Sequence, residues 1–107
     1  MAYTVKQSNP AAATPADLYT VPAGKEAVIS TLAVCEHGDV ATRFRVLVRP
    51  AGAAAAAVHR LAYDAPVAGL DTVFLTIGAA LAAGDVVTVE AATADVTFTA
   101  FVSETEV

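Results

Sequence analysis

The chain has 107 residues, 56% of them apolar, and its eleven acidic and six basic side chains give a formal net charge of -5. A chain of this length forms one domain with its own core, and the single cysteine excludes an intrachain disulfide. The negative charge opposes attraction to nucleic acid and to anionic membranes, so we expect neither as a partner. No apolar run approaches the roughly 20 residues that span a bilayer, and the first ten residues lack the apolar core of a secretory signal.

The N-terminal sixteen residues divide into a short strand and an arm. Residues 3–6 have the composition of a strand, whereas residues 7–16 contain two prolines, Pro10 and Pro15, four alanines and no periodicity. Fixing such a segment alone costs conformational entropy, so we expect it to be mobile or to lie along another subunit. The sequence therefore predicts an N-terminal strand and arm over residues 1–16 and a β-sandwich domain over residues 17–107.

A tight turn follows at residues 21–25, between an apolar run at residues 18–21 and a β-branched run at residues 28–35. Pro22 fixes one backbone torsion and Gly24 accepts a positive φ, which is the chemistry of a turn between two strands. The pattern indicates either a hairpin or a sandwich corner.

The clearest alternation in the chain spans residues 40–49. In a strand, successive side chains point to opposite faces, so Arg43, Arg45 and Arg49 share one face with Ala41 and Leu47. We expect the other face to be core, and it consists of Val40, Thr42, Phe44, Val46 and Val48.

The remaining strands are separated by turns rich in proline, glycine and aspartate. We expect a loop or single turn at the alanines of residues 53–57, a strand over 58–63 that ends at Asp64-Ala65-Pro66, and strands over residues 72–77, 86–91 and 96–103. The last strand places Phe98 inside and Phe101 outside, and the acidic residues 104–107 are expected to be loose. The pattern predicts an all-β fold with almost no helix. We expect a single antiparallel β-sandwich, jelly-roll or immunoglobulin-like, with seven to eight short strands and an extended N-terminal arm.

Reactive side chains do not form a catalytic pattern. Cys35 lies two residues from His37, and His59 precedes Asp64, but neither pair includes a nucleophile, a base and an orienting group together. We interpret Cys35 as a small buried residue and His59 as a histidine on the sheet surface. No glycine-rich phosphate-binding motif is present. We therefore predict no catalytic residue and no cofactor.

One short stretch has metal-ligand chemistry. Glu36, His37 and Asp39 lie within four residues, but no further spaced ligands accompany them. The pattern favours a solvated turn, and we predict no metal site.

Four of the six basic residues are arginines on two neighbouring strands, namely Arg43, Arg45, Arg49 and Arg60. Arginine is well suited to paired contacts with carboxylates in an interface, and the same group binds phosphate or acidic sugars. The alternatives are a solvated face, a protein interface, and a nucleic-acid or glycan site. The absence of tryptophan and the presence of only three tyrosines disfavour the glycan reading.

Several turn motifs carry a family resemblance over nearly the whole chain. Residues 19–25 read YTVPAGK, residues 49–52 read RPAG, residues 62–64 read AYD, and residues 81–89 follow the pattern L..GD.V.V. In these motifs the chain resembles small β-sandwich structural proteins of tailed bacteriophages. It departs from them in the alanine run after Gly52 and in Ser103, where relatives often have glycine before the glutamate.

The resemblance implies a non-enzymatic virion component, made in the host cytoplasm. We expect a capsid decoration or cement protein that oligomerises and binds the major capsid protein of the outer shell; the excess of alanine and valine fits surface that partners cover. The alternatives are a neck, tail or fibre-associated virion protein, and a glycan-binding module that uses Tyr63, His59 and the arginines. The L..GD.V.V turn is also similar to jelly-roll trimers of the tumour-necrosis and complement type, which implies a homotrimer. The expected partner interface comprises Arg43, Arg45, Arg49, Arg60, Pro10 and Pro15.

Overall fold

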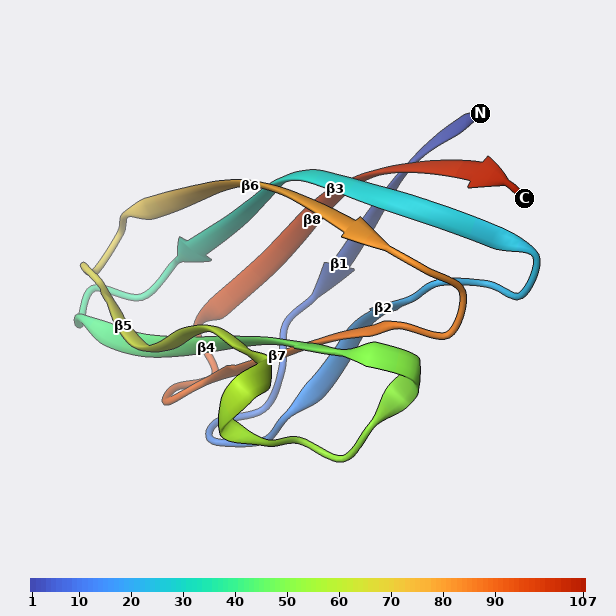
Figure 1. Cartoon of the computed structure of the whole chain (residues 1–107). Coiled ribbons are helices and arrows are strands. Elements are labelled where there is room, and N and C mark those ends of the chain that lie inside the picture. Colours follow the sequence, from blue (N-terminus) through green and yellow to red (C-terminus); the bar gives the residue numbers. More distant parts are fainter.

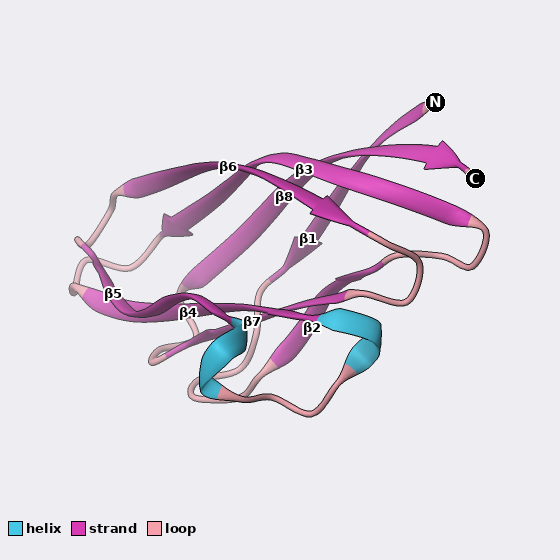
Figure 2. Cartoon of the chain, viewed as in Figure 1, coloured by secondary structure: helices cyan, strands magenta, loops and turns pink.

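The computed structural model describes residues 1–107 and contains eight strands in two four-stranded sheets (Figures 1 and 2). Sheet A has the strand order β1-β8-β3-β6, and sheet B has the order β2-β7-β4-β5. Helix is limited to the single 3-10 turns η1 (Pro50–Gly52) and η2 (Ala57–His59). The prediction of an all-β sandwich is confirmed. The strands are β1 (Ala2–Ser8), β2 (Ala16–Thr20), β3 (Lys25–Glu36), β4 (Thr42–Arg49), β5 (Arg60–Val67), β6 (Thr72–Leu81), β7 (Val86–Ala91) and β8 (Val96–Glu106).

The strand pairing is that of a long hairpin rolled up on itself. β1 pairs with β8, β2 with β7, β3 with β6 and β4 with β5, all antiparallel. Successive pairs alternate between the two sheets, and the β4–β5 connection closes the hairpin. This is the strand order of a jelly roll, in which two sheets face each other across one core. The structure thus decides between the two sandwich types that the sequence left open.

The turn at residues 21–24 is a sandwich corner, because it joins β2 in sheet B to β3 in sheet A. The backbone nitrogen of Lys25 donates to the carbonyl of Pro22 over 3.2 Å, and Gly24 has a φ of +76°. Glycine adopts this left-handed conformation without strain, as the sequence predicts. The turn is also tied to the β6–β7 connection, since the nitrogen of Gly84 donates to the carbonyl of Val21 over 3.0 Å.

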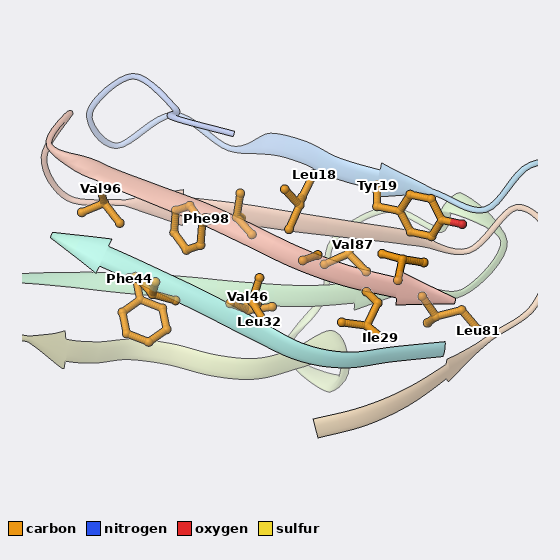
Figure 3. Packing of buried hydrophobic residues seen from close by; sticks show 14 of the residues in the cluster. Leu18, Tyr19, Ile29, Leu32, Phe44, Val46, Leu81, Val87, Val96 and Phe98 are labelled. Atoms are coloured by element: carbon orange, nitrogen blue, oxygen red, sulfur yellow. The ribbon is translucent and has the colours of Figure 1, made fainter. Parts of the chain in front are cut away.

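The core lies between the two sheets and is built from residues of every strand except β1, mostly at alternate positions (Figure 3). Phe44 of β4 and Phe98 of β8 meet across it edge to face, with ring centroids 6.2 Å apart. The predicted inner and outer faces of β8 are confirmed, because Phe98 is fully buried while Phe101 is 43% exposed. On β4 the predicted core face is confirmed from Thr42 onward, but Val40 precedes the strand and is 69% exposed.

The N-terminal region belongs to the sandwich and is not an extended arm. β1 pairs with β8 along its whole length, and residues 9–15 form the loop that leads to β2. The side-chain nitrogen of Asn9 donates to the carbonyl of Ala94 over 2.9 Å and to a carbonyl of β8 over 2.7 Å. Residues 1–16 are therefore part of the same domain as residues 17–107, because strand pairing and these bonds offset the entropy of fixing them.

The strand β5 runs through the residues that were expected to end it. Asp64 has a φ of +52°, and the register between β4 and β5 shifts opposite it, which is the geometry of a β-bulge. β5 is an edge strand of sheet B. An edge position tolerates Pro66, because the missing amide hydrogen can face away from the neighbouring strand.

The acidic C-terminal residues are also ordered, in contrast to the expected loose tail. β8 extends to Glu106, and Glu104 lies opposite Ala2 of β1. The carboxylate of Glu104 accepts a hydrogen bond from the Tyr19 hydroxyl and lies 3.8 Å from the Lys25 ammonium. Burial and this hydrogen bond raise the pKa of Tyr19. The two chain termini accordingly lie side by side (Figure 1).

Candidate interaction surfaces

The outer face of sheet A is almost free of charge. Its side chains alternate with the core residues of the same four strands, so they point away from sheet B. Glu26, at one end of β3, is the one charged side chain among them. We call this surface the uncharged face; it consists of Tyr3, Val5 and Gln7 of β1, Thr97, Thr99, Phe101, Ser103 and Thr105 of β8, Val28, Ser30, Thr31, Ala33 and Cys35 of β3, and Thr72, Phe74, Thr76 and Ala80 of β6.

Large apolar side chains are distributed across all four strands of the uncharged face. Tyr3 is 79% exposed, Phe74 65% and Val5 51%, and Val28 and Phe101 are also exposed. The register places Val5 directly opposite Phe101, so the two side chains form a cross-strand pair. Several large exposed apolar side chains on one face are typical of an interaction site.

A shallow groove of about 550 Å³ crosses this face where β1, β8 and β3 lie next to one another. Tyr3 and Val5 line it from β1, Phe101 and Ser103 from β8, and Ser30 from β3. The β3 register shifts at Ser30, and the shift bends the strand at the groove. The uncharged face is therefore hollowed at its most aromatic part.

The outer face of sheet B is charged but largely neutralised within the chain. Arg49 lies 3.1 Å from a carboxylate oxygen of Asp17 and donates to the hydroxyl of Thr88 over 3.0 Å. It also donates to the carbonyl of Ala53 over 2.9 Å, which holds the alanine loop against the sheet. Three strands and one loop are thus joined through one guanidinium.

Arg45 forms the second half of this network. Its guanidinium donates to both carboxylate oxygens of Asp64, over 2.7 and 3.4 Å, and lies 3.9 Å from Glu90. Two guanidinium groups contact the ring of Tyr63. The guanidinium carbon of Arg45 lies 4.3 Å from the ring centroid and that of Arg60 lies 3.8 Å from it, so both form cation–π contacts. The Arg45 hydrogen bond lowers the pKa of Asp64 and raises the pKa of Arg45 itself.

The contribution of the Arg45–Asp64 ion pair to the stability of the fold should depend on pH. Because the folded-state pKa of Asp64 lies below its ordinary value of 3.8, the pair stabilises the fold above that value, and the stabilisation is lost as the pH falls through the lowered pKa. Asp64→Asn should therefore lower the midpoint of thermal unfolding at pH ~7 and have a smaller effect at pH ~2. A decrease of equal size at both pH values would contradict this assignment.

Not all residues of the expected partner interface remain available to a partner. Arg45 and Arg49 are paired with carboxylates of their own chain, whereas the expectation placed those carboxylates on another protein. Arg43 is exposed and donates to the carbonyl of Asp64 over 2.9 Å, without a carboxylate partner. Among the prolines, Pro10 is buried in its own chain and Pro15 is exposed.

The two pairs of reactive residues considered in the sequence do not form hydrogen-bonded pairs in the structure. Cys35 is half-buried on the uncharged face, while His37 is exposed in the following turn. The Nδ1 atom of His59 accepts a hydrogen bond from the backbone nitrogen of Ala56 over 3.2 Å, and Asp64 is held by Arg45. The structure therefore joins neither of the two pairs.

The fold and its two contrasting faces define a small jelly-roll module with one charged, internally paired face and one uncharged face. A scan against protein-family models, a search of curated proteins and a search of solved structures return no match to this chain. Neither of the two 3-10 turns could span a bilayer.

Sequence reasoning did not find most of the uncharged face. The available signal was the identity of the residues that alternate with the core positions: Phe101 stood out as an apolar residue on the outer side of its strand, and Phe74 occupies an equivalent place in β6. What the sequence lacked was the strand order. Tyr3, Val28, Phe74 and Phe101 come from four strands that only the folded sheet places together.

Proposed function

We propose that this chain is a non-enzymatic structural protein of a tailed-bacteriophage virion, a capsid decoration or cement protein that associates with further copies of itself and binds the outer shell. The observation that carries the proposal is the uncharged face of sheet A. The self-associating surface is this face, and its occupant is the same face of a second copy, which gives a two-fold pair in place of the homotrimer that the turn motif implies.

Charge does not oppose a second copy as the occupant of this face. Each chain carries a formal net charge of -5, so two copies repel each other unless their charged groups stay apart. In a two-fold contact the same patch meets itself, and a charged patch would then meet its own sign. The uncharged face avoids this repulsion, and its aromatic and valine side chains supply apolar area to bury.

The size of the face is adequate for such a contact. Four strands spaced about 4.8 Å apart, the shortest of them seven residues long, give a flat area on the order of 450 Å² before the relief of the side chains is added. A standard protein interface removes about 800 Å² of accessible surface per partner. The two values are comparable, so packing of two A sheets face to face accounts for an interface of ordinary size.

The virion context is supported by the four turn motifs that resemble small structural proteins of tailed phages, and by the jelly-roll fold itself. Jelly rolls are common in viral coat proteins, although lectins and cupins share them, so this second support is an analogy of fold. Binding of many identical copies to a repetitive shell multiplies weak contacts into stable attachment.

Quantitative mass spectrometry of purified particles tests the proposal. A decoration protein should be present in amounts comparable to the major capsid protein, because it follows the shell lattice. A copy number in small multiples of three or six would instead place the protein in the neck, tail or fibre. Its absence from particles would reject a virion role altogether.

A further inference from the structure

Buried oxygen atoms without hydrogen-bond partners gather at one end of the sandwich. The chain has three such side-chain oxygens, and they belong to Glu36, Thr42 and Thr93. Glu36 is the last residue of β3, Thr42 is the first of β4, and Thr93 lies in the turn between β7 and β8. Because β7 and β8 are antiparallel to β4 and β3, this turn lies at the same end as the β3–β4 connection.

Glu36 is the residue that requires an explanation. It is 1% exposed, and its Oε1 atom accepts a hydrogen bond from the backbone nitrogen of Gly38 over 2.8 Å, while Oε2 has no partner. No lysine or arginine forms an ion pair with it. A buried carboxylate without a counter-charge is strongly unfavourable. The sequence interpretation of residues 36–39 as a solvated turn is therefore wrong for Glu36.

The carboxylate of Asp95 borders Gly38 on the side of Oε1, the hydrogen-bonded oxygen of Glu36. A Cβ atom placed on Gly38 would lie 2.7 Å from Oδ2 of Asp95 and 3.0 Å from Oε1 of Glu36. Both carboxylates thus border the space beside Gly38. The arrangement is fixed by the backbone, since the nitrogen of His37 donates to the carbonyl of Asp95 over 2.9 Å.

We propose that this end of the sandwich binds one divalent cation of the calcium type, with Glu36 and Asp95 as its carboxylate ligands. The cation supplies the positive charge that Glu36 lacks and separates two carboxylates that otherwise repel each other. It ties the end of β3 to the start of β8, which strand pairing and the His37–Asp95 backbone hydrogen bond already bring together at that point.

The ligand chemistry indicates the kind of cation. No group of three or more histidine, cysteine, aspartate or glutamate side chains surrounds any point of the chain, so a site of the zinc type with nitrogen and sulfur ligands does not fit. The groups that border Gly38 are the carboxylate oxygens of Glu36 and Asp95, with backbone carbonyls and water to complete the shell. Calcium takes six to eight oxygen ligands of this mixed kind in flexible geometry.

Calorimetric titration and thermal unfolding of the full chain, freed of metal with a chelator, test the proposal. Calcium chloride should bind with a stoichiometry of one per chain. At about ten times the dissociation constant it should raise the unfolding midpoint by about 5–10 °C. Magnesium chloride at the same ionic strength separates calcium preference from a general divalent effect, and either metal acting through these ligands supports the site.

Three variants locate the effect. Asp95→Asn removes an exposed carboxylate and Glu36→Gln removes the buried one, and each should reduce the metal-induced shift to near zero. Glu26→Gln removes the same charge at the opposite end of β3 and should keep the shift. If Glu36→Gln does not fold, Asp95→Asn decides alone. The absence of binding by the wild-type chain, or a shift retained in Asp95→Asn, would overturn the proposal.

Discussion

Replacing Phe98 by alanine is expected to lower the free energy of unfolding by about 3–5 kcal/mol. Phe98 is fully buried on β8, a central strand of sheet A, and its ring packs edge to face against Phe44 of sheet B (Figure 3). Removing the ring takes away apolar area and leaves a cavity between the two sheets, which the strands on either side of β8 cannot close. Urea denaturation measures the loss. The urea concentration at the midpoint should fall, while the dependence of the unfolding free energy on urea concentration should not change.

The matched control for this substitution lies three residues away on the same strand. Phe101→Ala removes the same ring from the outer face, where the side chain is 43% exposed, and should cost less than about 1 kcal/mol in the monomer. Equal losses for the two variants would mean that the core does not depend on the Phe44–Phe98 contact.

Phe101→Asp is expected to weaken self-association about 30-fold or more, equivalent to about 2 kcal/mol. Phe101 lies on β8 in the interior of the uncharged face, beside Val5 and Thr31 on the neighbouring strands. A two-fold contact would bury the new carboxylate of each copy in an apolar interface, and desolvation disfavours this. Sedimentation velocity over a range of concentrations measures the change in the dissociation constant.

The control for the association experiment is Val58→Asp, which adds the same charge at a position in η2 that is 87% exposed. It should leave self-association unchanged. A wild-type chain that is monomeric at high concentration, or an equal effect of both substitutions, would show that the uncharged face does not join two copies. Thermal unfolding of both variants verifies that each is folded.

Much of the fold follows from local patterns in the sequence. The bounds of β7 were predicted at residues 86–91, and the inward side of β8 was predicted from alternation alone. These succeeded because the pleat of a strand imposes a period of two wherever one side is buried. The prediction of a turn at Gly24 was correct because few residues other than glycine accept its backbone conformation.

The errors have tertiary causes. Residues 64–66 were interpreted as a strand end because aspartate and proline are rare in strands, but the edge position of β5 removes the penalty for Pro66. Residues 104–107 were interpreted as loose because they are acidic, although Tyr19 and Lys25 hold Glu104 in place. In both cases the cause is a strand that lies nearby in the fold but is distant in the sequence.

The candidate sites divide in the same way. The sequence placed Arg43, Arg45 and Arg49 on one face, but it could not show that Asp64 and Asp17 neutralise two of them from other strands. It placed Glu36 next to His37, but not next to Asp95.

The sequence by itself determined an all-β sandwich, the two sides of its longest alternating strands and the positions of its glycine and proline turns, because these depend on neighbouring residues. Only the tertiary structure decided that the sandwich is a jelly roll, that four strands combine into one uncharged face, and that a buried glutamate meets a second carboxylate. Each of these depends on which strands lie side by side, and strand order is set by the packing of the whole chain.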